Sequence, residues 1–147
     1  MLPDYEPTTG YLPPGRHSTA WSEVVERFAT NAHRTGLLGF LENALQLLRQ
    51  AGCRQAWLNG SFTTDAAQPH DVDVAWDAYG VRPKDLHPLF RSNTAEIRAE
   101  RRKAFGGDYV AVYEDDASVI RFYETDRSGV PKGIVAINLN TLPKGSA

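Results

Sequence analysis

Two aspartates separated by one valine, Asp71 and Asp73, are the residues of this chain that are best suited to chemistry. Side chains alternate along a β-strand, so within the apolar segment "DVDVAWD" both carboxylates point to one face, about 7 Å apart at Cα. Two carboxylates this close repel each other, which raises their pKa values unless a cation lies between them. Hard oxygen ligands suit Mg²⁺ or Mn²⁺, so the spacing indicates a divalent metal site formed by Asp71 and Asp73.

A Gly-Ser turn follows the apolar segment "QAWLN" and precedes the two aspartates by nine residues. Gly60 has no Cβ, so the backbone can approach a ligand closely there. Backbone amides that open a short helix after a strand bind phosphate, and the Ser61 hydroxyl adds a donor. A phosphate-binding turn beside two metal-binding carboxylates indicates a nucleoside triphosphate site, in which the metal would neutralise the departing pyrophosphate. Lys132 and Arg127 could reach such a triphosphate, and they equally suit an ordinary turn.

The elements that must position these residues begin with two helices. A first helix is predicted near Trp21, with Ser18 or Thr19 as its cap, and a second follows a cap at Thr30 or Asn31. The second helix has a wide apolar stripe, which predicts a helix packed on a sheet. The stripe comprises Leu37, Leu41, Ala44, Leu45 and Leu48.

About five strands are predicted after these helices. They are "QAWLN", "DVDVAWD", "DYVAVY", "VIRFYET" and "KGIVAINL". The last two are predicted to form a hairpin through "DRSGVP", with Gly129 in a left-handed conformation. Residues 82–105 are predicted to be helical in two pieces. This order of elements predicts an α+β fold, with a mixed sheet and the N-terminal helices packed on it.

Length and composition limit the classes of protein to consider. The 147 residues suit one domain, predicted over residues 17–142, after a proline-rich extended arm over residues 1–16. A net charge of −2 argues against a protein that mainly coats nucleic acid. The single cysteine, Cys53, excludes an intramolecular disulfide and a cysteine-based zinc site, and favours the reducing cytoplasm. No signal peptide or membrane-spanning segment is predicted, so no membrane partner is expected.

The basic segment "RAERRK", residues 98–103, has two interpretations. Its arginines and lysine could contact an RNA backbone. Glu96 and Glu100 lie on the same predicted helix at pairing distance from some of these cations. We therefore favour a solvated face with ion pairs along the helix.

The combination of a Gly-Ser turn, a nine-residue spacer and Asp-x-Asp resembles the signature of the DNA-polymerase-beta-like nucleotidyltransferase superfamily. In this chain the signature reads Leu58-Asn59-Gly60-Ser61 and then Asp71-Val72-Asp73-Val74. More closely, residues 12–139 resemble a short bacterial family of nucleotidyltransferase-like domains with no assigned function. The segments "LPPGRHSTAW", "GCRQAWLNGSF" and "KGIVAINL" carry that similarity. The resemblance implies the minimal nucleotidyltransferase fold.

The resemblance also implies roles for the site residues. Asp71 and Asp73 would ligate the metal, and Gly60 and Ser61 would hold the β- and γ-phosphates. Active members usually add a third carboxylate from a later strand, which activates the attacking hydroxyl.

The position expected for the third carboxylate in the last strand reads Asn138, which would weaken or inactivate the site. The alternatives are Asp108, Glu124 and Glu114. We prefer Asp108, because it opens a predicted strand directly after a helix.

Two functions follow as expectations. The first is a metal-dependent nucleotidyltransferase that moves NMP from an NTP to a hydroxyl of RNA or protein, as small relatives do in toxin–antitoxin or phage-defence systems. The second is an inactive binding module with the same fold, acting as an antitoxin, scaffold or nucleotide sensor beside a partner protein. The two retained carboxylates favour the enzyme, whereas Asn138 favours the binding module.

Overall fold

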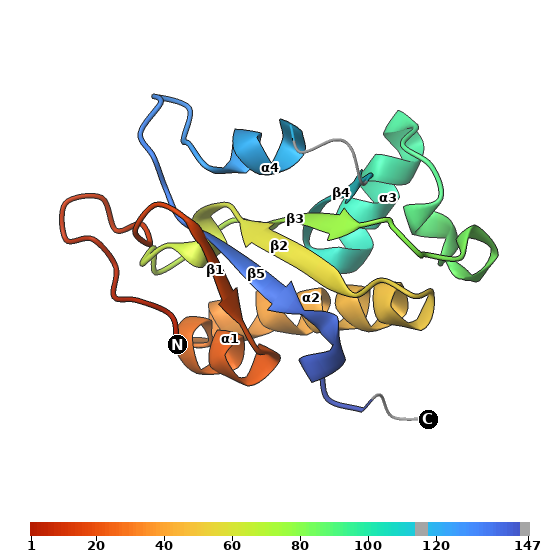
Figure 1. Ribbon diagram of the computed structural model, residues 1–147, viewed down its shortest axis with the longest axis horizontal. Coiled ribbons are helices and arrows are strands. Elements are labelled where there is room, and N and C mark those ends of the chain that lie inside the picture. The colour runs from red at the N-terminus through yellow and green to blue at the C-terminus, as the bar shows by residue number, and fades with distance from the viewer. Residues whose placement is uncertain (114–117, 145–147) are drawn as a thin grey trace.

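A five-stranded sheet is the centre of the computed structural model, which describes residues 1–113 and 118–144 (Figure 1). The strands are β1 (Arg16–Thr19), β2 (Gln55–Asn59), β3 (Val72–Asp77), β4 (Gly107–Val112) and β5 (Ile134–Asn138). They lie in the order β1-β5-β2-β3-β4. Pairs β1–β5 and β3–β4 are parallel, and β5–β2 and β2–β3 are antiparallel. The predicted α+β class with a mixed sheet is therefore confirmed.

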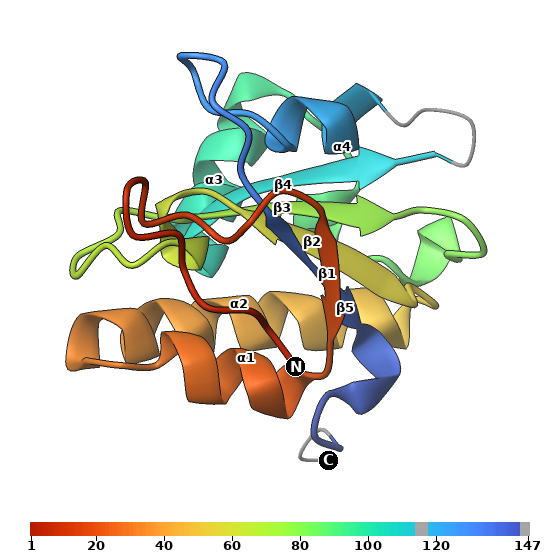
Figure 2. The same cartoon turned by 60° about the vertical axis from the view of Figure 1, so that its left-hand side comes forward.

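Helices cover both faces of this sheet (Figures 1 and 2). The helices are α1 (Trp21–Phe28), α2 (Ala32–Gln50), α3 (Ala95–Phe105) and α4 (Ser118–Tyr123). As predicted, α1 and α2 pack on one face, where the apolar stripe of α2 forms the main core with residues such as Leu58 and Val74. Helix α4 lies on the opposite face, and α3 packs beside β4. The sheet therefore has one fully covered face and one face that α4 covers in part.

The predicted strand "VIRFYET" is wrong, because residues 119–123 lie in α4. The predicted turn through "DRSGVP" is present, and an isolated antiparallel bridge pairs Thr125 with Pro131 across it. Ile120 and Tyr123 are three residues apart, so they share one helical face and are buried in a small cluster with Ala75 and Ile134. A strand would place Ile120 and Phe122 on the same face, yet Phe122 is 78% exposed. The expected left-handed conformation at Gly129 is present, with φ at 81°.

Strand β1 was not predicted. Its residues were expected to end the N-terminal arm and to cap the first helix. Ser18 and Thr19 therefore belong to a strand, and the cap residue of α1 is Ala20, whose side chain forms no capping hydrogen bond. Instead the backbone amide of Trp21 donates to Oγ1 of Thr141 at 3.0 Å. Helix α2 is capped as predicted, because Oδ1 of Asn31 accepts from the amide of Arg34 at 2.8 Å.

Residues 82–105 form only the second of the two predicted helices. Two short 3₁₀ turns, Pro83–Asp85 and Pro88–Phe90, replace the first predicted helix, because prolines interrupt the backbone hydrogen bonds that a longer helix needs. The second predicted helix is α3, with Thr94 as its cap and Gly106 in a left-handed conformation after its last turn.

The N-terminal arm is packed on the domain. The side chains of Leu2 and Leu12 are buried in the main core, and the guanidinium of Arg27 donates to the carbonyls of Leu2 and Pro3. The arm is therefore part of the folded unit. Among the described residues, no helix combines the length and the hydropathy needed to cross a membrane.

Candidate functional site

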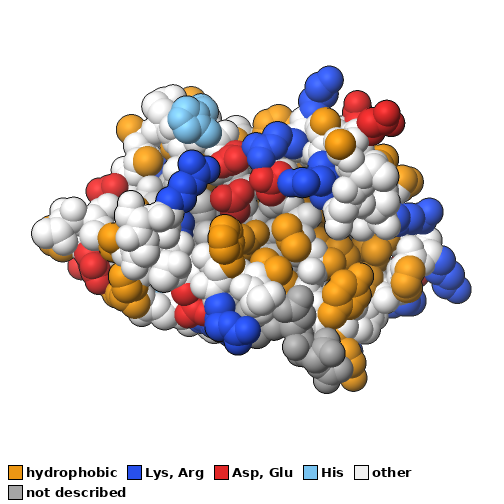
Figure 3. All heavy atoms as spheres, turned by 90° about the horizontal axis from the view of Figure 1, so that it is seen from above, with side chains coloured by type: hydrophobic (Ala, Val, Ile, Leu, Met, Phe, Trp, Pro, Cys, Tyr) orange, Lys and Arg blue, Asp and Glu red, His pale blue; other side chains and the backbone are white. Residues whose placement is uncertain are grey.

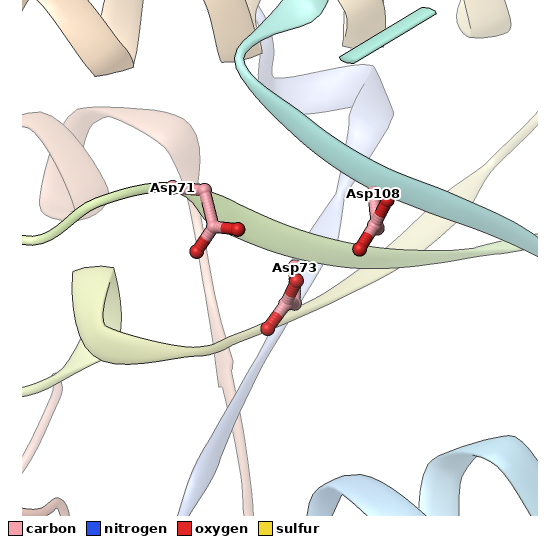
Figure 4. A group of neighbouring side chains, drawn as sticks. All are labelled: Asp71, Asp73 and Asp108. Carbon is pink, nitrogen blue, oxygen red and sulfur yellow. The ribbon is translucent and has the colours of Figure 1, made fainter. Parts of the chain in front are cut away.

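Acidic side chains gather on the partly covered face of the sheet, with basic side chains on both sides of them (Figure 3). Three carboxylates form this cluster: Asp71 precedes β3, Asp73 lies within β3, and Asp108 lies opposite Asp73 in β4. One carboxylate oxygen from each residue lies within 4.8 Å of the others (Figure 4). Of the three candidates for the third carboxylate, the structure thus places Asp108 beside the two sequence-predicted ligands.

Strand alternation explains why these carboxylates share a face. Val72, Val74 and Trp76 are buried against the helical layer, so Asp71 and Asp73, which alternate with them along the chain, project to the other side of the sheet. Gly107 lets β4 begin directly beside β3, because a Cβ there would lie 1.7 Å from the carbonyl oxygen of Val72. This close approach places Asp108 in register with Asp73.

The Gly-Ser turn lies directly against the acidic cluster. Strand β2 ends at Asn59, and Gly60 has φ of 86° and ψ of −173°, a conformation that essentially only glycine adopts. A Cβ on Gly60 would lie 2.9 Å from Oδ2 of Asp73. Ser61 opens a 3₁₀ turn over Ser61–Thr63. The structure therefore brings the predicted phosphate-binding turn and the predicted metal ligands together.

Arg34 of α2 holds the segment that follows this turn. Its side chain is 2% exposed, and its guanidinium donates to the carbonyls of Phe62, Thr64 and Ala66 at 2.6–2.9 Å. Burial lowers the pKa of this guanidinium. A buried cation satisfied by backbone carbonyls fixes the path of the chain between β2 and β3. Sequence reasoning missed this role, although an arginine near the apolar stripe of α2 was a signal for it.

Asn59 belongs to the Gly-Ser signature, but the sequence indicated no role for its side chain. Its side chain is 5% exposed, and its buried Oδ1 has no hydrogen-bond partner among the described residues. Asn59 lies opposite Asp73 in the antiparallel pair of β2 and β3, so both side chains lie on the same face. A buried acceptor without a donor is costly, and it is satisfied when a bound group donates to it. The available signal was a polar residue at the end of an otherwise apolar strand.

Electrostatics single out Asp73 within the cluster. Burial, and then the carboxylates of Asp71 and Asp108, raise the pKa of Asp73 to about 6. The positive charges of Lys132 and Arg102 oppose that increase. Part of the negative charge of the cluster is thus uncompensated, which favours binding of a cation there.

Arg102 of α3 bridges two of the three carboxylates. Its guanidinium lies 2.9 Å from Oδ2 of Asp71 and 2.6 Å from Oδ2 of Asp108. These two carboxylates raise the pKa of Arg102. Because Arg102 is half-exposed, its side chain can leave the carboxylates without breaking the core.

The favoured interpretation of the basic segment, a solvated face with ion pairs along the helix, is correct only for the solvation, because Glu96, Arg98, Glu100, Arg102 and Lys103 are exposed. Within residues 1–113 and 118–144, neither Glu96 nor Glu100 forms an ion pair. Arg101 is buried and donates to the carbonyls of Leu89 and Ser92. The reason is tertiary: α3 packs beside β4, so Arg101 faces the core and Arg102 faces the acidic cluster, whereas Arg98 and Lys103 are exposed.

Lys132 lies on the opposite side of the cluster from α3. It precedes β5 and is half-buried, and its Nζ lies 5.9 Å from the centre of the Tyr11 ring. Burial lowers the pKa of Lys132, and the negative charges of Asp73 and Asp126 oppose that change. The Tyr11 hydroxyl donates to Oδ2 of Asp126 at 2.8 Å, so the arm supports this side of the site. Arg127 is exposed on the turn before Lys132.

The expectation that Asn138 occupies the third-carboxylate position is wrong. Strand β5 runs antiparallel to β2 and places Asn138 opposite Gln55, four residues along β2 from Asn59, or about 13 Å by the strand rise. Asn138 thus lies at the other end of the sheet from Asp73. Glu124 forms an ion pair with Arg16 at 3.0 Å. Glu114 lies outside the described residues.

The donor set fits a hard divalent cation. Asp71, Asp73 and Asp108 offer carboxylate oxygens from a small region, and the orphaned Oδ1 of Asn59 offers a neutral acceptor on the same face. Mg²⁺ and Mn²⁺ prefer such oxygen ligands. The guanidinium of Arg102 is the cation that neutralises two of the carboxylates in this structure.

Comparison with known proteins identifies the family of the chain. A family model described as "Family of unknown function (DUF6932)" matches residues 3–138, so the chain belongs to that family. Neither the curated proteins nor the solved structures include a significant match.

Proposed function

We propose that this member of a family of unknown function is a metal-dependent nucleotidyltransferase, which moves NMP from an NTP to a hydroxyl. One observation carries the proposal. The carboxylates of Asp71, Asp73 and Asp108 converge on one face of the sheet, directly against the turn at Gly60. Converging carboxylates beside a glycine turn suit a metal bound to phosphates.

Each residue has a role in this proposal. Asp71 and Asp73 hold Mg²⁺ or Mn²⁺, which supplies charge neutralisation for the phosphates. Gly60 and Ser61 contact the β- and γ-phosphates through the turn. Lys132, which already lies close enough to Asp73 to interact with it, provides positive charge for the same phosphates. Asp108 accepts the proton of the attacking hydroxyl.

The proposed transfer is a single displacement. The hydroxyl oxygen forms a bond to the α-phosphorus, and the bond between that phosphorus and the oxygen bridging to the β-phosphate breaks. Pyrophosphate leaves with the electron pair of the broken bond, and the proton of the hydroxyl passes to Asp108. Arg102 leaves the carboxylates of Asp71 and Asp108 before the site can act, because its guanidinium neutralises both.

The position of Asn138 changes the balance between the two expected functions. Its amide was the argument for an inactive binding module, and it lies at the far end of the sheet from Asp73. The position beside Asp73 is an aspartate, Asp108. The complete set of carboxylates therefore supports the enzyme over the binding module.

Label transfer tests the proposal. The purified protein is incubated with each of four α-labelled NTPs and Mg²⁺ or Mn²⁺, with bacterial RNA and lysate protein as acceptors. We expect label on one acceptor class with the wild-type protein and none with Asp73→Asn.

The matched control is Asp77→Asn, which removes a carboxylate from the same face at the other end of β3. It should transfer label as the wild-type protein does. If no lane contains label while all three proteins are folded, the enzyme proposal is wrong and the binding module takes its place.

A further inference from the structure

An open depression of about 530 Å³ adjoins the acidic cluster, between β4 and α4. Its lining includes Asp73 and Asp108 of the cluster, Val110 of β4 and Phe122 of α4. Its size lies within the range of small-molecule sites, about 300–1,000 Å³. Figure 3 shows hydrophobic side chains next to the acidic ones on this face. The depression is thus continuous with the proposed catalytic site.

An exposed aromatic ring lines this depression. Phe122 is 78% exposed, whereas its neighbours Ile120 and Tyr123 attach α4 to the sheet. The small core therefore does not need Phe122. Exposed aromatic rings beside a reactive site are suitable for stacking of nucleobases, which contributes about 1–3 kcal/mol per base.

Arg98 of α3 adds a positive charge to the same depression. Its side chain is exposed, and it forms no ion pair with any residue that the structure describes. Nearby, Arg102 is engaged with two carboxylates. An arginine available in this way next to an exposed ring is the combination that binds the backbone and the bases of a single strand.

The order of the strands places this depression on the attacking side of the proposed reaction. Gly60 and Lys132 lie on the β2 and β5 side of Asp73, where the pyrophosphate leaves. Asp108 lies on the β4 side, next to the depression. In an in-line displacement the attacking and leaving oxygens lie on opposite sides of the phosphorus. An acceptor in the depression therefore presents its hydroxyl at Asp108.

We propose that the depression between β4 and α4 binds the 3′ end of a single-stranded nucleic acid, with its terminal base on Phe122 and its backbone at Arg98. This inference rests on the proposed function and names its acceptor. The 3′ hydroxyl oxygen forms the new bond to the α-phosphorus, its proton passes to Asp108, and pyrophosphate leaves with the electron pair of the broken bond.

Binding of labelled oligonucleotides by the metal-free protein tests the inference separately from catalysis. Fluorescence anisotropy is measured with single-stranded RNA and DNA of one sequence, about 12 nucleotides long, and with the corresponding duplex. We expect a single strand to bind more tightly than the duplex. Phe122→Ala should weaken that binding about fivefold or more, whereas Phe122→Tyr, which keeps the ring, should retain it.

Two matched controls separate the depression from the rest of the surface. Phe40→Ala removes a phenylalanine that is 42% exposed on α2, and Lys103→Ala removes a cation of α3 that does not line the depression. Both should bind RNA and DNA as the wild-type protein does. Arg98→Ala should weaken binding and reduce its dependence on salt. A phosphate on the 3′ end should also weaken binding, because it would meet Asp73 and Asp108.

The outcomes separate this inference from the proposed function. Absence of single-strand binding would overturn the inference, and so would an equal loss of affinity in Phe122→Ala and Phe40→Ala. Transfer of label to a protein acceptor would overturn it as well. Ring-dependent binding that persists in Asp73→Asn, without any transfer by the wild-type protein, would support the inference as a binding site and reject the enzyme.

Discussion

At the scale of single residues, Asp73 lowers the free energy of unfolding at neutral pH, and it is also a proposed metal ligand. It shares a small region with Asp71 and Asp108, and burial beside those carboxylates raises its pKa to about 6. This pKa lies above the value of about 3.9 for an unfolded chain. The folded protein therefore holds a proton on Asp73 more tightly than the unfolded chain does, and the free energy of unfolding decreases as pH rises from about 4 to 6.

Asp73→Asn should for this reason stabilise the protein at pH 7 by about 1–2 kcal/mol, after allowance for solvent screening. The advantage should disappear below about pH 4, where the carboxyl is neutral in both states. Urea denaturation of the wild-type protein and of Asp73→Asn, from below about pH 4 to pH 7, measures this difference in stability, with Asp77→Asn as control. A variant that is less stable than the wild-type protein at pH 7, or a difference independent of pH, would contradict the electrostatic account.

Arg102 is the second residue whose role can be tested alone. Its ion pairs with Asp71 and Asp108 are half-exposed, so removing them should cost less than about 1 kcal/mol of stability. The same guanidinium occupies the carboxylates that a metal would use. Arg102→Gln should thus bind Mn²⁺ several-fold more tightly than the wild-type protein in a calorimetric titration.

Lys103→Gln is the control for Arg102→Gln, because it makes the same change of charge on the same helix, away from the two carboxylates. It should leave the affinity for Mn²⁺ nearly unchanged. An equal gain in both variants would show that only net charge matters, and a loss in Arg102→Gln would show that Arg102 supports the site.

At the scale of elements, the turn between β2 and β3 must follow one path to reach Asp73. Gly60 adopts a conformation that other residues avoid, and the buried guanidinium of Arg34 holds the carbonyls that follow. The turn therefore contributes to the geometry of the site as well as to the connection of two strands.

Gly60→Ala should lower the free energy of unfolding by about 1–3 kcal/mol and weaken binding of Mn²⁺, because the new Cβ meets Oδ2 of Asp73 at 2.9 Å. Gly129→Ala is a matched comparison: its φ is also positive, at 81°, but its new Cβ would have no atom of the described residues within 4 Å. It should lose stability and keep its affinity for Mn²⁺. Equal affinities in both variants would mean that the turn has no part in the site.

Local patterns predicted the parts of the site that depend on one strand or one turn. Alternation along "DVDVAWD" placed Asp71 and Asp73 on one face, and the Gly-Ser sequence located the turn. The preference for Asp108 rested on its place in the chain. Its contact with Asp73 depends on the parallel pairing of β3 and β4, which brings together residues distant in sequence.

The errors arose where tertiary contacts override local preference. The segment "VIRFY" has residues typical of a strand, but α4 forms because Ile120 and Tyr123 are buried on the sheet. Strand β1 has the polar sequence "RHST", which carries no apolar alternation, and it exists because β5 offers it a paired edge. The position of Asn138 followed from the direction of β5, which a single sequence does not specify.

At the scale of the whole molecule, the N-terminal arm and the domain form one folded unit. Leu12 of the arm is 1% exposed, and backbone hydrogen bonds connect the arm to residues 133 and 134 before and within β5. The arm also supports Lys132 through Tyr11. Stability of the arm and of the proposed phosphate side of the site should therefore be coupled.

Leu12→Ala should destabilise the entire domain by about 2–4 kcal/mol, as Leu45→Ala in the core of α2 should, because both leucines are buried in the same core. Thermal unfolding followed by circular dichroism should remain a single transition in both variants. A negligible loss in Leu12→Ala, or a separate early transition, would show that the arm folds independently of the domain.

The central claim is that Asp71, Asp73 and Asp108 together hold a divalent cation beside the turn at Gly60. The most direct measurement is Mn²⁺ binding by electron paramagnetic resonance, with and without an NTP, for the wild-type protein and for Asp73→Asn and Asp77→Asn. We predict Mn²⁺ binding that the NTP strengthens, that Asp73→Asn abolishes and that Asp77→Asn retains. Equal binding by all three proteins, or no binding by the folded wild-type protein with the NTP present, would contradict the claim.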